Sequence, residues 1–516
     1  MLPLVARQRD LRLGVAGQRA REGLVTTADL FAPRPSAQQE AIFEFVARGT
    51  GHGLVRARAG TGKTTTVTNA VGRAPAHARV AVLAYNTRIA DELRPRIARL
   101  GRRNAEVLTL HALGNRALRK AWGVQGAPDK TRDRRLAAAA LPAKYQRAAR
   151  ELAAVASLCK SRLALDEEGI AREVRRSELA VVIPEGPAVE AIQAALAASL
   201  ERDGTYSFDD MVFVPAAHGW RTGSYDLVFV DEAQDMSAAQ LVLAQAALAP
   251  SGRLILVGDD RQAIYGWRGA DEGGIDRLKA ELDAAESPLS TTYRCPRAVV
   301  AEAARVVPDY TCPPSAPEGI VRCTSLERAD WRPGDAVLSR LNAPLVGLAL
   351  SALRAGVPAR IQGRDIAAGL AQWVRGLGCS AVPALLRAAE AWRDEELARL
   401  GEDDDGREAD VRDRVETLRA LAEGLGDTAA VLRRLEQLFD DEGDALVFSS
   451  VHRAKGLEWD RVFLVAATFR PSRTREEENL WYVALTRAKR ELVYVGGAKD
   501  AHVDEAIDRA LERRAA

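Results

Sequence analysis

The sequence predicts an α/β protein with two mainly parallel sheets covered by helices. Two observations indicate this fold class. Short apolar runs recur with helical patterns between them, and such continuous runs are typical of strands buried on both faces of a parallel sheet. The runs form two sets, and a chain of 516 residues is too long for one ordinary core, so we expect two domains.

The strands are expected where these runs lie. In the first domain they are 53–57, 79–85, 106–110, 225–230 and 253–258, and in the second 335–340, 445–451, 460–466 and 490–496. Two stretches without clear strands predict helical insertions, one basic and one short and acidic, the latter with a loop at 401–406. The expected division is an N-terminal extension (1–34), a first domain (35–111 and 206–288) with its insertion (112–205), and a second domain (289–372 and 444–516) with its insertion (373–443).

The net charge is only +2, but the charged residues are unevenly distributed along the chain. Residues 101–163 carry 14 Lys/Arg against 4 Asp/Glu, and residues 391–444 carry 8 against 18. The basic block is compatible with binding to a polyanion and equally with a solvated helical face. Five scattered cysteines without a CxxC pair indicate reduced thiols and no disulfide framework. No apolar run reaches membrane-spanning length and the N-terminus lacks a signal-like core, so we expect a cytoplasmic protein without membrane contact.

The stretch ARAGTGKT (57–64) predicts a phosphate-binding loop between a strand and a helix. Backbone N–H groups of such a loop face phosphate oxygens, Lys63 reaches the β- and γ-phosphates, and the Thr64 hydroxyl binds Mg²⁺. Ala57 stands where the motif normally opens with glycine. The ATP-binding residues expected here are Ala59, Gly60, Thr61, Gly62, Lys63, Thr64 and Thr65.

A second motif, VFVDEAQD (228–235), ends an apolar strand in two acids. Asp231 at the carboxyl end of a sheet would hold Mg²⁺, and Glu232 would activate the attacking water. Strand-end acids are often simple turn formers, but a phosphate loop in the same chain makes that reading less favourable. The first domain is therefore predicted to hydrolyse a nucleoside triphosphate.

An ordered series of motifs resembles the UvrD/Rep family of superfamily 1 helicases. Two departures from the family pattern are Ala57 and Cys295. The series comprises PSAQQEAI (35–42), the phosphate loop, AYNTRIADEL (84–93), TLHALG (109–114), FDDM (208–211), DEAQD (231–235), GDDRQAIYGWRGA (258–270), TTYRCP (291–296), SSVHRAKGLEW (449–459) and EEENLWYVALTRAK (476–489).

The resemblance implies two RecA-like motor domains with ATP in the cleft between them and single-stranded DNA across their tops, moving 3′ to 5′. Gln38 would read the adenine edge, Tyr293 would stack on adenine, and Glu458 would contact the ribose. Gln262 would sense the γ-phosphate. Two arginines of the second motor, Arg294 and Arg487, would stabilise the charge of the transferred phosphate.

DNA contacts are implied at six positions of the motifs: Tyr85, His111, Tyr265, Trp267, Arg268 and His452. Aromatic stacking tolerates any base, as a motor requires. Core packing is the alternative for Tyr85 and Tyr265. The expected substrates are single-stranded DNA and its junctions with duplex.

Other functions remain open at this stage. A DNA-dependent ATPase or translocase subunit that relies on a partner nuclease or replication protein would fit the short second insertion. Opposite polarity or a preference for RNA is a further alternative. A nucleotide-dependent binding module without catalysis is disfavoured, because none of the catalytic positions is degraded: Lys63, Asp231, Glu232, Gln262, Arg294 and Arg487.

Overall fold

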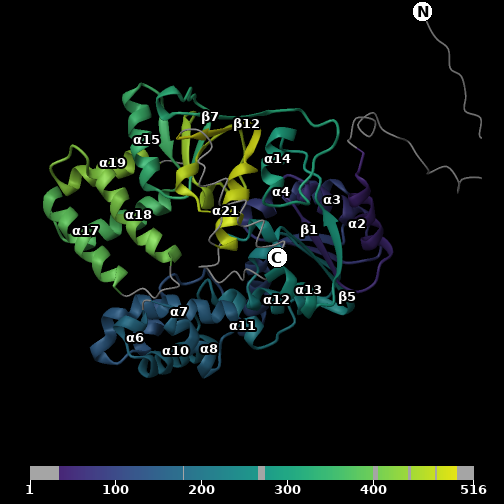
Figure 1. Ribbon diagram of the computed structural model, residues 1–516. Coiled ribbons are helices and arrows are strands. Elements are labelled where there is room, and N and C mark those ends of the chain that lie inside the picture. The colour runs from purple at the N-terminus through teal and green to yellow at the C-terminus, as the bar shows by residue number, and fades with distance from the viewer. Residues whose placement is uncertain are drawn as a thin grey trace, which may run out of the picture.

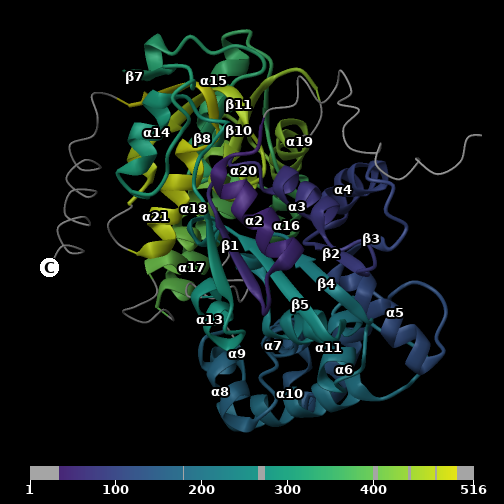
Figure 2. The ribbon, with the colours of Figure 1, turned by 90° about the vertical axis from the view of Figure 1, so that its right-hand side faces the viewer.

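The fold contains two six-stranded sheets that lie side by side (Figures 1 and 2). The computed structural model describes residues 34–177, 179–264, 274–398, 405–439, 443–470 and 474–496. Within these ranges, every pairing between named strands is parallel, and no helix is both long and apolar enough for a membrane span. The predicted class, two parallel sheets with helices, is confirmed.

The first sheet has the strand order β3-β2-β4-β5-β1-β6. Its central strands are buried along most of their length, as continuous apolar runs require. The strands are β1 (Gly53–Ala57), β2 (Val80–Ala84), β3 (Ala105–Thr109), β4 (Tyr225–Val230), β5 (Leu248–Gly258) and β6 (Ala285–Leu289). Its helices are α2 (Ala37–Arg48), α3 (Lys63–Arg73), α4 (Thr87–Arg99), α12 (Ala238–Gln245) and α13 (Gly274–Glu281).

Local sequence fixes where these helices begin. The Ser36 side chain accepts the N–H of Gln39 while the Gln39 side chain accepts the N–H of Ser36, which is a capping box for α2. The Asn86 side chain caps α4 in the same position, directly after β2. Strand ends and helix starts are therefore only a few residues apart, which places the connecting loops at the carboxyl edge of the sheet.

The second sheet has the order β7-β12-β11-β8-β10-β9. Its strands are β7 (Ile320–Thr324), β8 (Ala336–Ser339), β9 (Ala359–Ile361), β10 (Leu446–Ser450), β11 (Trp459–Val465) and β12 (Ala488–Val495). Helices α14 (Arg297–Ala304), α15 (Ala343–Arg354), α20 (Val451–Ala454) and α21 (Arg475–Leu485) pack on it.

The first insertion forms a helical lobe with its own apolar core, seen at the bottom of Figure 1. Its helices are α6 (Arg132–Ala140), α7 (Ala149–Arg162), α8 (Glu167–Arg175), α9 (Leu179–Val182) and α10 (Glu185–Leu200). Helices α5 (Leu110–Trp122) and α11 (Asp210–Ala217) join this lobe to the first sheet. At the junction the buried Asp210 carboxylate accepts from Arg132 at 2.7 Å and from Lys160 at 2.8 Å.

The acidic insertion has no separate core among the described residues. Its helices share one cluster with a face of the second sheet, where Leu385 and Leu418 join Phe448 and Phe463. They are α17 (Val382–Leu397), α18 (Asp405–Ala422) and α19 (Thr428–Leu438), preceded by α16 (Arg364–Gly376). The loop expected at 401–406 is partly wrong, because Asp405 and Gly406 already belong to α18; residues 401–404 lie outside the described ranges.

All nine predicted strands are present, with ends that differ by at most a few residues. Three others, β6, β7 and β9, were not predicted. β6 and β7 are edge strands with exposed positions, and β9 has three residues. Such strands lack the apolar run that indicates a buried strand, because one of their faces or edges is exposed to solvent.

Candidate nucleotide and nucleic-acid site

The phosphate loop links β1 to α3 at the carboxyl edge of the first sheet. Gly60 and Gly62 have φ values of 70° and 80°, a left-handed conformation that side chains disfavour. Gly62 is the N-cap of α3, so the free N–H groups of the first helical turn face the loop. A Cβ on Gly60 would lie 2.5 Å from Cβ of Arg294, so only glycine lets the second motor approach this closely.

The predicted catalytic acids, Asp231 and Glu232, follow β4, two strands away from the loop in the sheet order. Lys63 Nζ lies 3.6 Å from Glu232 Oε2, and Glu232 has a left-handed φ of 52°. Burial and the Glu232 carboxylate raise the pKa of Asp231. Burial opposes ionisation of Glu232 as well, but the Lys63 and Lys455 ammonium groups lower its pKa. Glu232 is thus the anionic member of the pair, and the same lysine charges that keep it ionised also weaken it as a base.

The residues that would bind Mg²⁺ fit that ion chemically. The Thr64 hydroxyl and the Asp231 carboxylate are hard oxygen donors of the kind Mg²⁺ prefers. The Asp231 side chain is buried, and the raised pKa shows that its anion is poorly compensated by the protein alone. A divalent cation at this carboxylate would supply the missing positive charge.

Gln262 lies on a 3-10 turn, η3 (Asp260–Gln262), directly after β5. Its amide Nε2 donates to Asp259 Oδ2 at 2.7 Å, and Asp259 is fully buried. Arg58, at the start of the phosphate loop, donates to Asp259 and, at 2.7 Å, to Asp260. One amide donor of Gln262 is therefore already held by a buried carboxylate of its own turn.

The two predicted catalytic arginines belong to the second domain. Arg294 forms an ion pair with Glu458 at 2.6 Å. Arg487 is 1% exposed and donates to the carbonyls of Val483 and Leu457. Burial and the neighbouring Arg294 guanidinium lower the pKa of Arg487 to about 10, so an anion placed between the two arginines would be favoured.

The expected adenine contacts lie beside the loop. The Tyr293 ring is 55% exposed, and its backbone N–H donates to Gly60 O at 2.9 Å. Gln38 Nε2 donates to Ser290 Oγ and Gln38 Oε1 accepts from Ser290 N, so Ser290 orients the amide. Glu458, expected at the ribose, is half-exposed.

Three of the predicted DNA contacts follow carboxyl ends of parallel strands. Tyr85 comes after β2, His111 after β3 and His452 after β10, and all three are half-buried. The other three, Tyr265, Trp267 and Arg268, lie outside the described residues. Burial lowers the pKa of His111 to about 4, so its ring is neutral at physiological pH.

The structure adds residues that the sequence analysis missed. Phe208 is 57% exposed and stacks on His111, with ring centroids 4.2 Å apart and planes at 25°. It lies within the FDDM motif, and that position in a motif was the only signal that the sequence offered for it. Lys455 of the second motor donates to Asp235 of the first at 2.6 Å, a pair that no spacing in the sequence indicates.

Two family models match the chain. The UvrD/REP helicase N-terminal domain matches residues 36–283, and the UvrD-like helicase C-terminal domain matches residues 445–495. The chain belongs to the UvrD/Rep family. The resemblance read from the motifs is thereby confirmed, and the two parallel sheets are its two RecA-like motor domains.

The chain is similar to two named kinds of DNA helicase. The ATP-dependent DNA helicase UvrD2 of Mycobacterium tuberculosis is 28% identical over an alignment of 564 positions, which covers 90% of this chain and 79% of that protein. UvrD2 of Mycobacterium bovis has the same identity and coverage. The ATP-dependent DNA helicase PcrA of Staphylococcus aureus is 32% identical over 119 residues, or 21% of this chain and 16% of PcrA.

Proposed function

We propose that this protein is an ATP-dependent DNA helicase that moves 3′ to 5′ along single-stranded DNA. One observation carries the proposal: Arg294 of one motor lies against Gly60 in the phosphate loop of the other, and its charge acts on Lys63. A site divided between two bodies couples nucleotide state to their separation. The names of the relatives support ATP and DNA as substrates, and the direction rests on the family resemblance.

The proposed chemistry uses side chains of both motors. Lys63 and the N–H groups at the start of α3 bind the β- and γ-phosphates, and Thr64 and Asp231 hold Mg²⁺, which supplies charge neutralisation. Glu232 takes a proton from the attacking water. Arg294 and Arg487 stabilise charge on the transferred phosphate, so the cleft must close for hydrolysis and can open after it.

The proposed DNA surface lies where loops leave the carboxyl ends of the strands. The exposed Phe208 ring and the neutral His111 ring present an aromatic face without a fixed charge. Such a face stacks on bases of any type. The same edge of the first sheet bears the phosphate loop, so a shift of these loops on hydrolysis would be transmitted to a stacked base.

Strand displacement from partial duplexes tests the proposal. Substrates with a 3′ or a 5′ single-stranded tail are compared with and without ATP, using the natural chain, Lys63→Ala and the control Lys279→Ala, a partly exposed lysine of the same motor that pairs with Glu286. We expect ATP-dependent displacement from the 3′ tail, lost in Lys63→Ala and kept in Lys279→Ala. Displacement only from the 5′ tail would contradict the direction.

The same experiment separates the alternative function. ATP hydrolysis stimulated by single strands without displacement of any duplex would favour a translocase subunit that depends on a partner. Unchanged hydrolysis in Lys63→Ala would refute the assignment of the phosphate loop.

A further inference from the structure

Helix α21 of the second motor contacts two separate parts of the first motor's ATP site along one stripe. Residues 475, 478, 479 and 482 are spaced i, i+3, i+4 and i+7, which places them on one face of a helix. Thr474 caps this helix, and three glutamates in its first turn suit the positive end of its dipole. The stripe therefore sits on a well-defined helix that ends two residues before Arg487.

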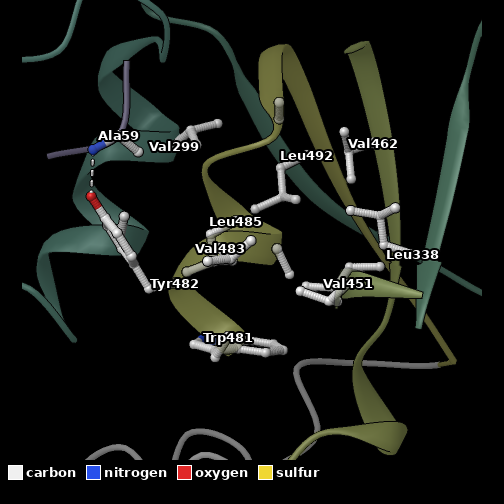
Figure 3. Close-up of a cluster of buried hydrophobic side chains, with 14 of the residues drawn as sticks. Ala59, Val299, Leu338, Val451, Val462, Trp481, Tyr482, Val483, Leu485 and Leu492 are labelled. Atoms are coloured by element: carbon white, nitrogen blue, oxygen red, sulfur yellow. Dashed lines mark hydrogen bonds between the residues drawn. The ribbon is translucent and has the colours of Figure 1, made fainter. Parts of the chain in front are cut away.

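Tyr482, at the C-terminal end of the stripe, contacts the phosphate loop. The Ala59 backbone N–H donates to Tyr482 Oη at 2.9 Å, as the dashed line in Figure 3 shows. The Ala59 carbonyl accepts from Tyr310 Oη at 3.0 Å. Ala59, Tyr310 and Tyr482 are each at most 1% exposed, so water has no access to these groups while the motors are in contact.

The two tyrosines support each other and the loop. Their rings meet edge to face with centroids 5.5 Å apart. Figure 3 shows Tyr482 at the margin of the second motor's apolar cluster, pointing to Ala59, while Trp481 and Val483 face into that cluster. Both backbone polar groups of Ala59, in the first motor's loop, are thus bonded to hydroxyls of the second motor.

The N-terminal part of the stripe, residues 475–479, contacts the turn that contains Gln262. Asn479 Nδ2 donates to the carbonyls of Asp260 and Ala263, at 3.2 and 3.0 Å, on either side of Gln262. Arg475 donates to the Asp260 carboxylate at 2.9 Å, and Glu478 accepts from Arg261 at 3.1 Å. Asn479 is 2% exposed, so its two bonds are also shielded from water.

We propose that Tyr482, assisted by Tyr310, and Asn479 are positioning residues that set the phosphate loop and the Gln262 turn from the second motor. This inference rests on the proposed ATP-driven function and deepens it. Closure of the cleft forms these bonds, and opening returns the groups to water. Their loss therefore weakens the closed, nucleotide-binding arrangement without removing any group that touches ATP.

The two ends of the stripe predict different defects. Tyr482→Phe removes one hydroxyl and leaves the Ala59 N–H buried without a partner in the closed state. We expect a dissociation constant for a non-hydrolysable ATP analogue raised by about 5- to 100-fold, with kcat at saturating ATP changed by no more than about threefold. Asn479→Ala releases the Gln262 turn, so kcat in the presence of single-stranded DNA falls about tenfold or more while analogue binding changes little.

Tyr494→Phe is the matched control. Tyr494 Oη donates to Glu302 at 3.1 Å inside the second motor, and Tyr494 is similarly buried, but neither residue belongs to the stripe. Analogue binding, steady-state ATP hydrolysis with single strands, and the thermal midpoint are measured on the full chain for all three variants. We expect comparable thermal midpoints for the two Tyr→Phe variants and a shift in analogue binding for Tyr482→Phe alone.

The outcomes separate this inference from the proposed function. If Tyr482→Phe and Tyr494→Phe bind the analogue with the same dissociation constant, the proposed role of Tyr482 is wrong, whatever the thermal midpoint of Tyr482→Phe. Asn479→Ala with an unchanged kcat overturns the role of Asn479. A natural chain that binds the analogue but hydrolyses no ATP would refute the proposed function, while the binding comparison would still decide the inference.

Discussion

The pair formed by Lys455 and Asp235 is the sharpest test of coupling between the two motors. It joins SSVHRAKGLEW of the second motor to DEAQD of the first, with Nζ and Oδ2 2.6 Å apart. The side chains are 10% and 3% exposed. The change we consider is Lys455→Met, which keeps the length of the side chain and removes its charge.

The size of the effect follows from burial. At 2.6 Å and an effective dielectric constant of about 20, the attraction is roughly 6 kcal/mol before desolvation is subtracted. Removing one partner of a buried pair costs about 3–5 kcal/mol, because the other charge stays buried. Gln234 Nε2 still donates to Asp235 at 3.2 Å and partly compensates the remaining carboxylate. We therefore use the smaller cost of about 3 kcal/mol. A penalty of about 3 kcal/mol on closure corresponds to roughly a 100-fold effect.

The assay is kcat/KM for ATP in the presence of saturating single-stranded DNA. We expect Lys455→Met to lower it by about 100-fold at pH 8, with the thermal midpoint changed little, since each motor keeps its own core. Burial already raises the pKa of Asp235, and the Lys455 charge opposes that rise. Without Lys455 the carboxyl takes up a proton more readily, so the deficit should shrink as the pH falls from 8 to 6.

The double variant Asp235→Asn/Lys455→Met supplies the control, because it leaves no uncompensated charge at the interface. We expect it to recover at least tenfold of the lost kcat/KM. A kcat/KM of Lys455→Met within about threefold of the natural chain would show that the pair does not couple the motors. The same conclusion follows if the fold loss of kcat/KM in the double variant equals the product of the fold losses in Asp235→Asn and Lys455→Met.

Three further results are expected. Phe208→Ala should weaken binding of single-stranded DNA by about 1–3 kcal/mol, measured by fluorescence anisotropy, with ATP binding unchanged; equal losses of both would point to packing instead. His111 has a folded pKa near 4 against an ordinary 6.5, so the unfolded state binds its proton first and stability is lost as the pH falls through that window. The loss should reach about 2 kcal/mol at pH 5, and His111→Phe should flatten the thermal midpoint between pH 7.5 and 5. Trp267→Ala should leave part of the ATP hydrolysis intact while movement on DNA is impaired; equal loss of stability and of both activities would indicate a core residue.

Much of the architecture could be predicted from local pattern. The apolar runs at 53–57 and 225–230 coincide with β1 and β4, because a strand buried on both faces needs continuous apolar residues. The order of the motifs led to the family, since a phosphate loop and strand-end acids need particular residues at fixed spacing. The polar edge strand β6 and the exposed β7 carry no such pattern and escaped prediction.

The sequence by itself determined which residues form the apolar strands, the phosphate loop and the acidic strand ends, because each depends on neighbours within a few positions. Only the tertiary structure decided how the motors hold one another. Tyr482 lies 423 residues from Ala59 and Lys455 lies 220 from Asp235, yet each pair is in hydrogen-bond contact. The contact between His111 and Phe208 is likewise non-local. Such contacts depend on how whole sheets and helices pack, and no periodicity along the chain records that packing.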